Sequence, residues 1–360
     1  MLIGAKSCRA EKNMFKKLFG KFSRDLGIDL GTSNILVYVK DKGIVVNEPS
    51  IVSVNSRTNQ IIAVGRDAQE MLGKTPTHIV TCRPLSKGII SDFEVAEKML
   101  RYFIEKVHED TFTIVPRPRV VICIPLEITE VEKKAVEDAV LLAGAREVAL
   151  VEEPLAAAIG ARLPVEESLG NMVVNIGGGN TEIAVISLAG VVTWKSLHVA
   201  GDEMTKNIIQ FARERYNLLL GERIAELIKM RIGSAEELET PLEMEMRGRD
   251  LLSGLPAEII VNDEQIRGAL ARSVRLIADN IKATLEVTPP ELTADIYERG
   301  MVLTGGGALL KGLEKYIAKA TEVPVRVADD PLTCAVRGAG ILLENDRLLK
   351  EVAVPSGRRS

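Results

Sequence analysis

The feature that most constrains the fold is a repeated pattern of strand, turn of small residues, and strand. It occurs as LGIDLGTSNILVYV at residues 26–39 and as NMVVNIGGGNTEIAVI at residues 171–186. Alternating apolar residues anchor such turns to a sheet. Successive glycine N–H groups can line a concave site for an anion such as phosphate, because no Cβ atoms intervene. For either stretch alone, a flexible hairpin without a ligand is the alternative.

A third glycine-rich turn, Gly305-Gly306-Gly307, follows the apolar run at residues 301–304, and a helix is predicted from Ala308. Apolar strands also alternate with helical segments through the first half of the chain. The segment from Thr129 to Glu132 has the pattern of a capping box, in which the first and last side chains satisfy the first helical N–H groups. This alternation predicts the α/β class.

The composition sets limits on size, compartment and partners. A chain of 360 residues, with 46% hydrophobic and 27% charged residues, favours two soluble domains. The net charge of −4 provides no general attraction for nucleic acid, so no nucleic-acid partner is expected. The 4 cysteines form no CxxC pair, which argues against zinc and favours a reducing cytosol. No apolar run approaches the roughly 20 residues that cross a bilayer.

Residues 1–22 combine a tail with a short amphipathic segment. The apolar residues Phe15, Leu18, Phe19 and Phe22 recur at helical spacing, with lysines elsewhere around the helix. This pattern is typical of a basic helix lying on a membrane surface. A terminal helix docked on the protein's own core is the alternative. Met14 is a plausible alternative translation start, and residues 353–360 are expected to be a flexible tail.

Several longer motifs point to one known family. They include IDLGTSN, RPLSKGIISDFEVAEKML, EEPLAAAIGARLPVEE, VAGDEM, LLLGERIAE and LTGGGALLKGL. Through these motifs the chain resembles the superfamily of actins, sugar kinases and heat-shock chaperone ATPases. Within that superfamily it is similar to the bacterial MreB family over residues 14–344.

The resemblance implies an α/β, actin-like two-domain fold, made of duplicated RNase H-like domains with four subdomains around a central nucleotide cleft. Subdomain IA would comprise residues 23–52, 87–158 and 335–352, with IB at 53–86. Subdomain IIA would comprise residues 159–200 and 265–334, with IIB at 201–264.

The resemblance also implies a Mg-ATP site. Asp29 would hold Mg²⁺ through its water shell, and Glu153 would act as general base, although an acid at a helix N-terminus is also favoured electrostatically. The residues implied to contact the nucleotide lie in four groups: Gly31, Thr32, Ser33 and Asn34; Gly177, Gly178, Gly179, Asn180, Gly201 and Asp202; Glu222, Arg223, Ile224 and Ala225; and Gly305, Gly306, Gly307 and Ala308.

The chain departs from the family at several of these positions. Relatives usually carry Asp where this chain has Asn175, and Thr where it has Asn180. The usual residues help to order water near the metal and to hold the attacking water. We therefore expect ATP binding to persist and hydrolysis to be slow, with Asn175→Asp raising the rate of phosphate release.

Proteins of this family polymerise with ATP into paired protofilaments beneath the inner membrane. The resemblance therefore implies a cytoplasmic, peripheral membrane protein that assembles with itself, contacts the inner-membrane surface, works with cell-wall synthesis and elongation proteins, and maintains rod shape. Two alternatives belong to the same superfamily, a small-molecule kinase and a plasmid-segregating actin-like ATPase.

Overall fold

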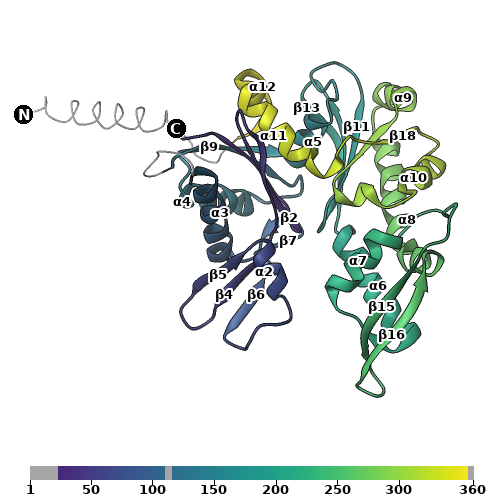
Figure 1. The fold of residues 1–360 in the computed structure, drawn as a ribbon. Coiled ribbons are helices and arrows are strands. Elements are labelled where there is room, and N and C mark those ends of the chain that lie inside the picture. Colours follow the sequence, from purple (N-terminus) through teal and green to yellow (C-terminus); the bar gives the residue numbers. More distant parts are fainter. Residues whose placement is uncertain (1–22, 110–115, 356–360) are drawn as a thin grey trace, which may run out of the picture. The chain divides into compact units, whose positions relative to one another are not determined.

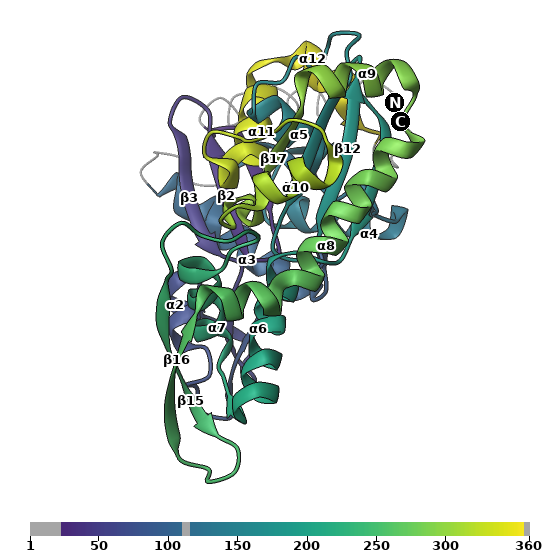
Figure 2. The ribbon, with the colours of Figure 1, turned by 90° about the vertical axis from the view of Figure 1, so that its right-hand side faces the viewer.

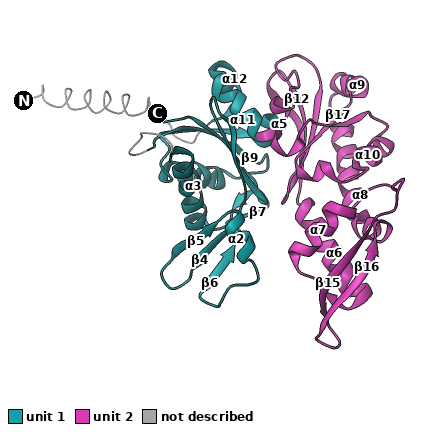
Figure 3. Ribbon diagram, viewed as in Figure 1, with its two compact units in different colours: residues 1–156, 336–360 teal, residues 157–335 magenta. Residues whose placement is uncertain are grey.

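The computed structural model describes residues 23–109 and 116–355. The chain divides into two compact units (Figure 3). Unit 1 comprises Met1–Ala156 and Val336–Ser360, and unit 2 comprises Ala157–Ala335. The two boundaries between the units fall inside helices α5 (Glu153–Gly160) and α11 (Cys334–Glu344).

Unit 1 is built on a six-stranded sheet of order β19-β10-β9-β1-β2-β3. The central strand β1 pairs antiparallel with β2, as the strand and turn pattern predicts, and parallel with β9. All five residues of β1 are buried, so both faces of the sheet are covered there. The strands are β1 (Leu26–Leu30), β2 (Asn34–Val39), β3 (Gly43–Pro49), β9 (Arg119–Ile124), β10 (Glu147–Glu152) and β19 (Ala353–Val354).

Helices α3 (Phe93–His108) and α4 (Glu130–Leu142) pack against each other in unit 1 (Figure 1). The predicted capping box of α4 is confirmed, since Thr129 accepts from the Glu132 backbone and the Glu132 side chain accepts from the Thr129 backbone. The unit also contains a smaller sheet of order β5-β4-β6 and a two-stranded ribbon. These elements are α2 (Arg66–Met71), β4 (Val52–Asn55), β5 (Gln60–Val64), β6 (Ile79–Cys82), β7 (Leu85–Ser86), β8 (Ile89–Ile90) and α12 (Asp346–Val352).

Unit 2 repeats the topology of unit 1. Its five-stranded sheet has the order β13-β12-β11-β17-β18, which corresponds strand by strand to β3-β2-β1-β9-β10. The central strand β11 again has an antiparallel hairpin partner, β12, and a parallel neighbour, β17. The repeated sequence pattern is therefore a repeated structural unit. The strands are β11 (Asn171–Ile176), β12 (Thr181–Ser187), β13 (Gly190–Leu197), β17 (Met301–Thr304) and β18 (Val325–Val327).

The remaining elements of unit 2 include the long helix α8 (Asp263–Val287), which begins with a capping box between Asn262 and Gln265. Figure 2 shows α8 beside α6, α7 and the hairpin of β15 and β16. These elements are α6 (Gly201–Tyr216), β14 (Leu218–Leu219), α7 (Glu222–Ile232), β15 (Glu243–Asp250), β16 (Pro256–Asn262), α9 (Pro290–Arg299) and α10 (Leu313–Thr321).

Two segments differ from the expectations. The α-helix predicted from Ala308 is wrong, because residues 306–309 form a 3₁₀ turn and the α-helix begins at Leu313. Gly312 has a φ of 71°, a left-handed conformation that interrupts a right-handed helix. Ala353 and Val354, assigned from the sequence to the flexible tail, instead form β19 against β10.

Phe15, Leu18, Phe19 and Phe22 lie outside the described residues, so the predicted membrane helix stays a prediction. Among the helices that the structure does describe, none combines the length and apolar character needed to cross a membrane.

Candidate functional site

The turn between β1 and β2 forms a tightly held loop in unit 1. A Cβ atom on Gly31 would lie 2.7 Å from the carbonyl oxygen of Asn34, so only glycine fits without a backbone shift. Ser50 Oγ donates to the Gly31 carbonyl over 2.7 Å, and Thr32 Oγ1 accepts from the Gly88 backbone over 2.8 Å. Neighbouring segments therefore fix the turn before any ligand binds.

Two carboxylates lie near this turn. Asp29 is buried in β1, and Glu153 is the first residue of α5. Burial raises the pKa of Asp29 well above its usual range, and the negative charge of Glu153 raises it further. A nearby cation would relieve both effects, because it favours the ionised carboxylate. The structure thus brings the predicted metal-holding residue and the predicted base into electrostatic contact.

The turn between β11 and β12 has the same construction in unit 2. The Gly177 N–H donates to the Asn180 carbonyl over 3.0 Å. A Cβ on Gly177 would lie 3.2 Å from that carbonyl oxygen, as the Cβ of Gly31 would approach Asn34. Asn180 itself is buried. Both turns therefore favour glycine at the equivalent position, where the backbone folds back on itself, and the first turn does so more strongly.

The N-terminus of α6 docks on the second turn. Gly201 N–H donates to the Gly177 carbonyl over 3.1 Å, and Asp202 N–H donates to the Gly178 carbonyl over 2.8 Å. These bonds satisfy helix donors that have no partner within the helix. They also bring the positive end of the helix dipole to the glycine turn, which favours a bound anion. The predicted residues of the VAGDEM motif are thus placed at the turn.

A partly buried polar cluster that sequence reasoning missed ties α6 to α7. Lys229 Nζ donates to the Gly201 carbonyl over 2.8 Å, to Thr205 Oγ1 over 3.0 Å and to Glu226 Oε2 over 2.7 Å. Glu226 and Lys229 stand three residues apart, and this spacing was readable from the sequence. It is also the spacing of ordinary solvated pairs on helix surfaces, so it carried no signal by itself.

Residues 222–225 form the first turn of α7. Glu222 and Arg223 are exposed there, Ile224 packs partly against the core, and Ala225 is fully buried. The side chain of Ala225 therefore belongs to the core rather than to a ligand surface. Glu222 and Arg223 are the members of this group whose side chains can reach a ligand.

The third glycine turn packs directly on the strand that leads to the second. A Cβ on Gly305, which has a φ of 78°, would overlap the Ile176 carbonyl oxygen, and one on Gly307 would overlap the Ile176 side chain. A Cβ on Gly306 would meet only Leu332 side-chain atoms, at 3.7 Å. Close approach to β11 therefore explains two of the three glycines, whether or not adenosine packs there, and Ala308 is buried behind them.

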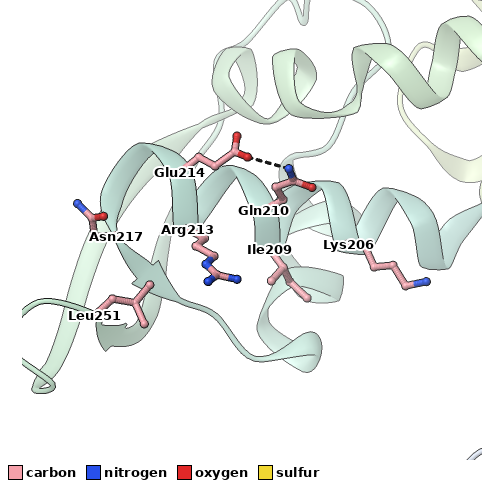
Figure 4. Close-up of a pocket in the computed structure, with 7 residues that line it drawn as sticks. All are labelled: Lys206, Ile209, Gln210, Arg213, Glu214, Asn217 and Leu251. Atoms are coloured by element: carbon pink, nitrogen blue, oxygen red, sulfur yellow. Dashed lines mark hydrogen bonds between the residues drawn. The ribbon is translucent and has the colours of Figure 1, made fainter.

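A hollow of about 750 Å³ lies elsewhere in unit 2, along the outer face of α6 (Figure 4). No residue predicted from the sequence lines it. Gln210 Nε2 donates to Glu214 Oε1 over 2.7 Å at its rim. Its lining residues are Lys206, Ile209, Gln210, Arg213, Glu214, Asn217 and Leu251. Within residues 23–109 and 116–355, no group of three or more His, Cys, Asp or Glu residues is arranged to hold a metal directly.

A duplicated α/β unit with a glycine turn at the same place in each sheet is the construction of actin-like proteins. The structure matches MreB5 of Spiroplasma citri bound to ADP, with a TM-score of 0.86 and 35% identity, covering 92% of this chain and 98% of that one. It also matches the AMPPNP-bound form, with a TM-score of 0.86 and 35% identity, over 90% of this chain and 97% of that one. The actin-like fold is therefore confirmed.

The sequence comparisons define the family. The family described as MreB/Mbl protein matches residues 23–351. The cell shape-determining protein MreB of Escherichia coli (strain K12) is 50% identical over 335 residues, which cover 92% of this chain and 96% of that protein. The chain belongs to the MreB/Mbl family.

Proposed function

We propose that this protein binds ATP with Mg²⁺ and assembles into filaments on the inner face of the cytoplasmic membrane, where they organise cell-wall synthesis and maintain rod shape. The observation that carries this proposal is the pair of glycine turns at equivalent positions of two duplicated sheets. The family supports it, since an Escherichia coli relative is a cell shape-determining protein and a Spiroplasma citri relative binds ADP and AMPPNP.

In this proposal the backbone of residues 31–34 and 177–180 contacts phosphate oxygens, with the N-terminus of α6 adding its dipole. Asp29 holds Mg²⁺ through water, and its buried carboxylate is the hard oxygen donor that this ion prefers. When bound, Mg²⁺ supplies positive charge to the phosphates. Glu153, close enough to Asp29 to raise its pKa, orients the attacking water.

The adenosine contacts in this proposal come from Glu222, Arg223 and the backbone of residues 305–307. The four subdomains follow the boundaries predicted from the sequence, except that subdomain IA also includes Ala353 and Val354, which pair with β10. The paired protofilaments and the elongation proteins are likewise part of the proposal.

Membrane attachment through residues 1–22 complements filament assembly. A single amphipathic helix this short binds lipid weakly, but a filament repeats it many times, and linked weak sites gain avidity without new contacts. Attachment should therefore depend on assembly, which gives the proposal a direct test.

The test compares the full-length protein with a variant lacking residues 1–22. We expect both proteins to form double filaments with ATP in electron micrographs, and only the full-length protein to sediment with liposomes made of anionic lipids. Nucleotide-free protein should do neither efficiently. A truncated protein that still sediments with liposomes would refute the anchor. Monomers that turn over ATP only with an added small-molecule substrate would support the kinase alternative.

A further inference from the structure

The hollow along the outer face of α6 carries a row of alternating apolar and cationic side chains (Figure 4). Lys206, Ile209 and Arg213 follow one another along the helix, and Leu251 continues the row from the loop after β15. Residues three, four and seven apart share one face of a helix. None of the three helical positions belongs to the buried residues of α6, so the row lies at the surface.

The two cations of this row are not engaged by the protein itself. In the part of the chain that the structure describes, neither Lys206 nor Arg213 has a hydrogen-bond or ion-pair partner for its side chain, although Glu203 stands one turn before Lys206. The acid at the rim, Glu214, accepts from Gln210 instead. Solvated cations are common on helices, but these two stand on either side of the half-buried Ile209. The hollow therefore combines two available positive charges with apolar surface.

The loop that closes the hollow is held in one conformation by its own hydrogen bonds. Leu251 N–H donates to the Asn217 carbonyl over 2.8 Å. Asp250 Oδ1 accepts from the N–H groups of Leu252 over 2.9 Å and Ser253 over 2.6 Å. Leu251 itself is 41% exposed, so an apolar wall is present before any ligand binds. A preformed wall lowers the conformational cost of binding.

The spacing of the cations decides what kind of ligand fits. Positions 206 and 213 stand seven residues apart, which is about 10 Å along a helix axis. Their side chains do not converge in Figure 4, and Ile209 lies between them. A single small anion could therefore contact only one of them. A helix that carries two acids seven residues apart presents both on one face, with room for an apolar side chain between them.

We propose that this hollow is a docking site for an acidic amphipathic helix of a partner protein. In the complex, one acid of the partner contacts Lys206 and the other contacts Arg213, while its apolar side chains pack on Ile209 and Leu251. A helix fills the concave space between α6 and the loop, which a flat bilayer surface would not. Because the ion pairs remain near solvent, the contact is weak and sensitive to salt. No residue proposed to bind nucleotide lines this site, so docking does not require the proposed function to hold.

The test uses nucleotide-free, full-length protein and a fluorescently labelled peptide of about 18 residues, long enough to form a helix. The peptide is rich in alanine, with two glutamates seven residues apart and leucines midway between them and one turn beyond each. Fluorescence anisotropy should show binding to the wild-type protein, and no binding of a peptide with lysines in place of the glutamates. Lys206→Glu combined with Arg213→Glu should weaken binding of the glutamate peptide at least about tenfold and create binding of the lysine peptide.

Arg215→Glu provides a matched control. Arg215 is exposed in the same last turn of α6 as Arg213 but does not line the hollow. The same change of charge there should alter binding of the glutamate peptide less than about twofold. The Tm of all variants should stay within about 2 °C of the wild type, since exposed substitutions have small effects on stability.

Three outcomes would overturn the docking site. These are wild-type protein that does not prefer the glutamate peptide, an equal loss of binding from Arg215→Glu, or no binding of the lysine peptide by the double variant at an unchanged Tm. A fourth would assign the cations to lipid instead, namely a double variant that no longer sediments with anionic liposomes but binds the glutamate peptide as the wild type does. The comparison of the two peptides on wild-type protein requires no substitution, so it decides the matter even where the double variant fails to fold.

Discussion

The two central strands occupy equivalent places in their sheets but place their acidic residue differently. In unit 1 the acid is on the central strand itself, where Asp29 faces Leu36 and Cys123. Neither neighbour can stabilise a charge well, and burial raises the pKa of Asp29. The ionised form of this acid is therefore poorly stabilised by its strand neighbours.

In unit 2 the central strand carries a neutral amide, and the acid stands on the return strand of the hairpin. Asn175 faces Glu182 and Thr304, which are polar, and the Thr304 hydroxyl donates to Asn175 Oδ1 over 3.1 Å. The comparison teaches that duplication preserved the backbone of the turn while the side chains beneath it diverged. The acid of unit 1 faces Leu36 and Cys123, whereas the acid of unit 2 faces the polar side chains of Asn175 and Ser196.

The largest effect is expected at a difference between the two units, in the segment after the parallel neighbour of the central strand. In unit 1, β9 is followed by Pro125, whereas in unit 2 β17 is followed by the third glycine turn. Gly305→Ala should lower the free energy of unfolding by about 3 kcal/mol, because it combines a positive φ with overlap of the Ile176 backbone. Urea unfolding measures this loss.

Gly306→Ala is the matched control for that substitution. Its new Cβ would make only ordinary contact with Leu332, so the expected change in the free energy of unfolding is below about 1 kcal/mol. Equal losses at the two positions would show that the third turn does not depend on close approach to β11.

A smaller effect is expected from removing the buried charge of unit 1. Asp29→Asn should raise the free energy of unfolding of nucleotide-free protein by about 2 kcal/mol at pH 7, because the variant no longer buries a carboxylate. It should also weaken Mg-ATP binding at least about tenfold, since the proposed water-mediated contact of this carboxylate with Mg²⁺ is lost. Glu153→Gln, which removes the lesser cause of the raised pKa, should stabilise less.

The stability gained by Asp29→Asn should depend on pH, because the pKa of Asp29 is raised in the folded protein. An acid whose pKa is raised in the folded protein favours folding only while it stays protonated. The destabilisation of the folded state by Asp29 therefore grows as the pH rises above about 3.9, the pKa of Asp in the unfolded chain. The stability advantage of Asp29→Asn should therefore be small near pH 4 and increase toward neutral pH. A constant advantage across that range would show that Asp29 does not carry the raised pKa.

The sequence predicted most of the fold because the fold depends on local patterns. The two hairpins and the capping box at Thr129 were readable, since each arises from neighbours in the chain. The delayed start of α10 was not, because it depends on the conformation of Gly312 beside Glu236, a residue far away in sequence.

The site was less completely predictable, because its contacts join residues that are far apart in the sequence. The glycines and Asp29 stand out in the sequence, whereas Lys229 gains meaning only through its bonds to Gly201 and Thr205 on another helix. Glu182 looked like an ordinary strand residue. The strand register was needed to place it opposite Asn175.

The smallest prediction tests how closely the two turns correspond. A Cβ at Gly31 would lie 2.7 Å from a backbone oxygen, whereas one at Gly177 would lie 3.2 Å from its equivalent. Gly31→Ala must move the backbone, which Ser50 also holds, and should cost about 2 kcal/mol of unfolding free energy. Gly177→Ala needs a shift of only a few tenths of an ångström and should cost about 1 kcal/mol. Urea unfolding of both variants measures the difference, and a greater loss at Gly177 would show that the second turn is the more tightly constrained of the two.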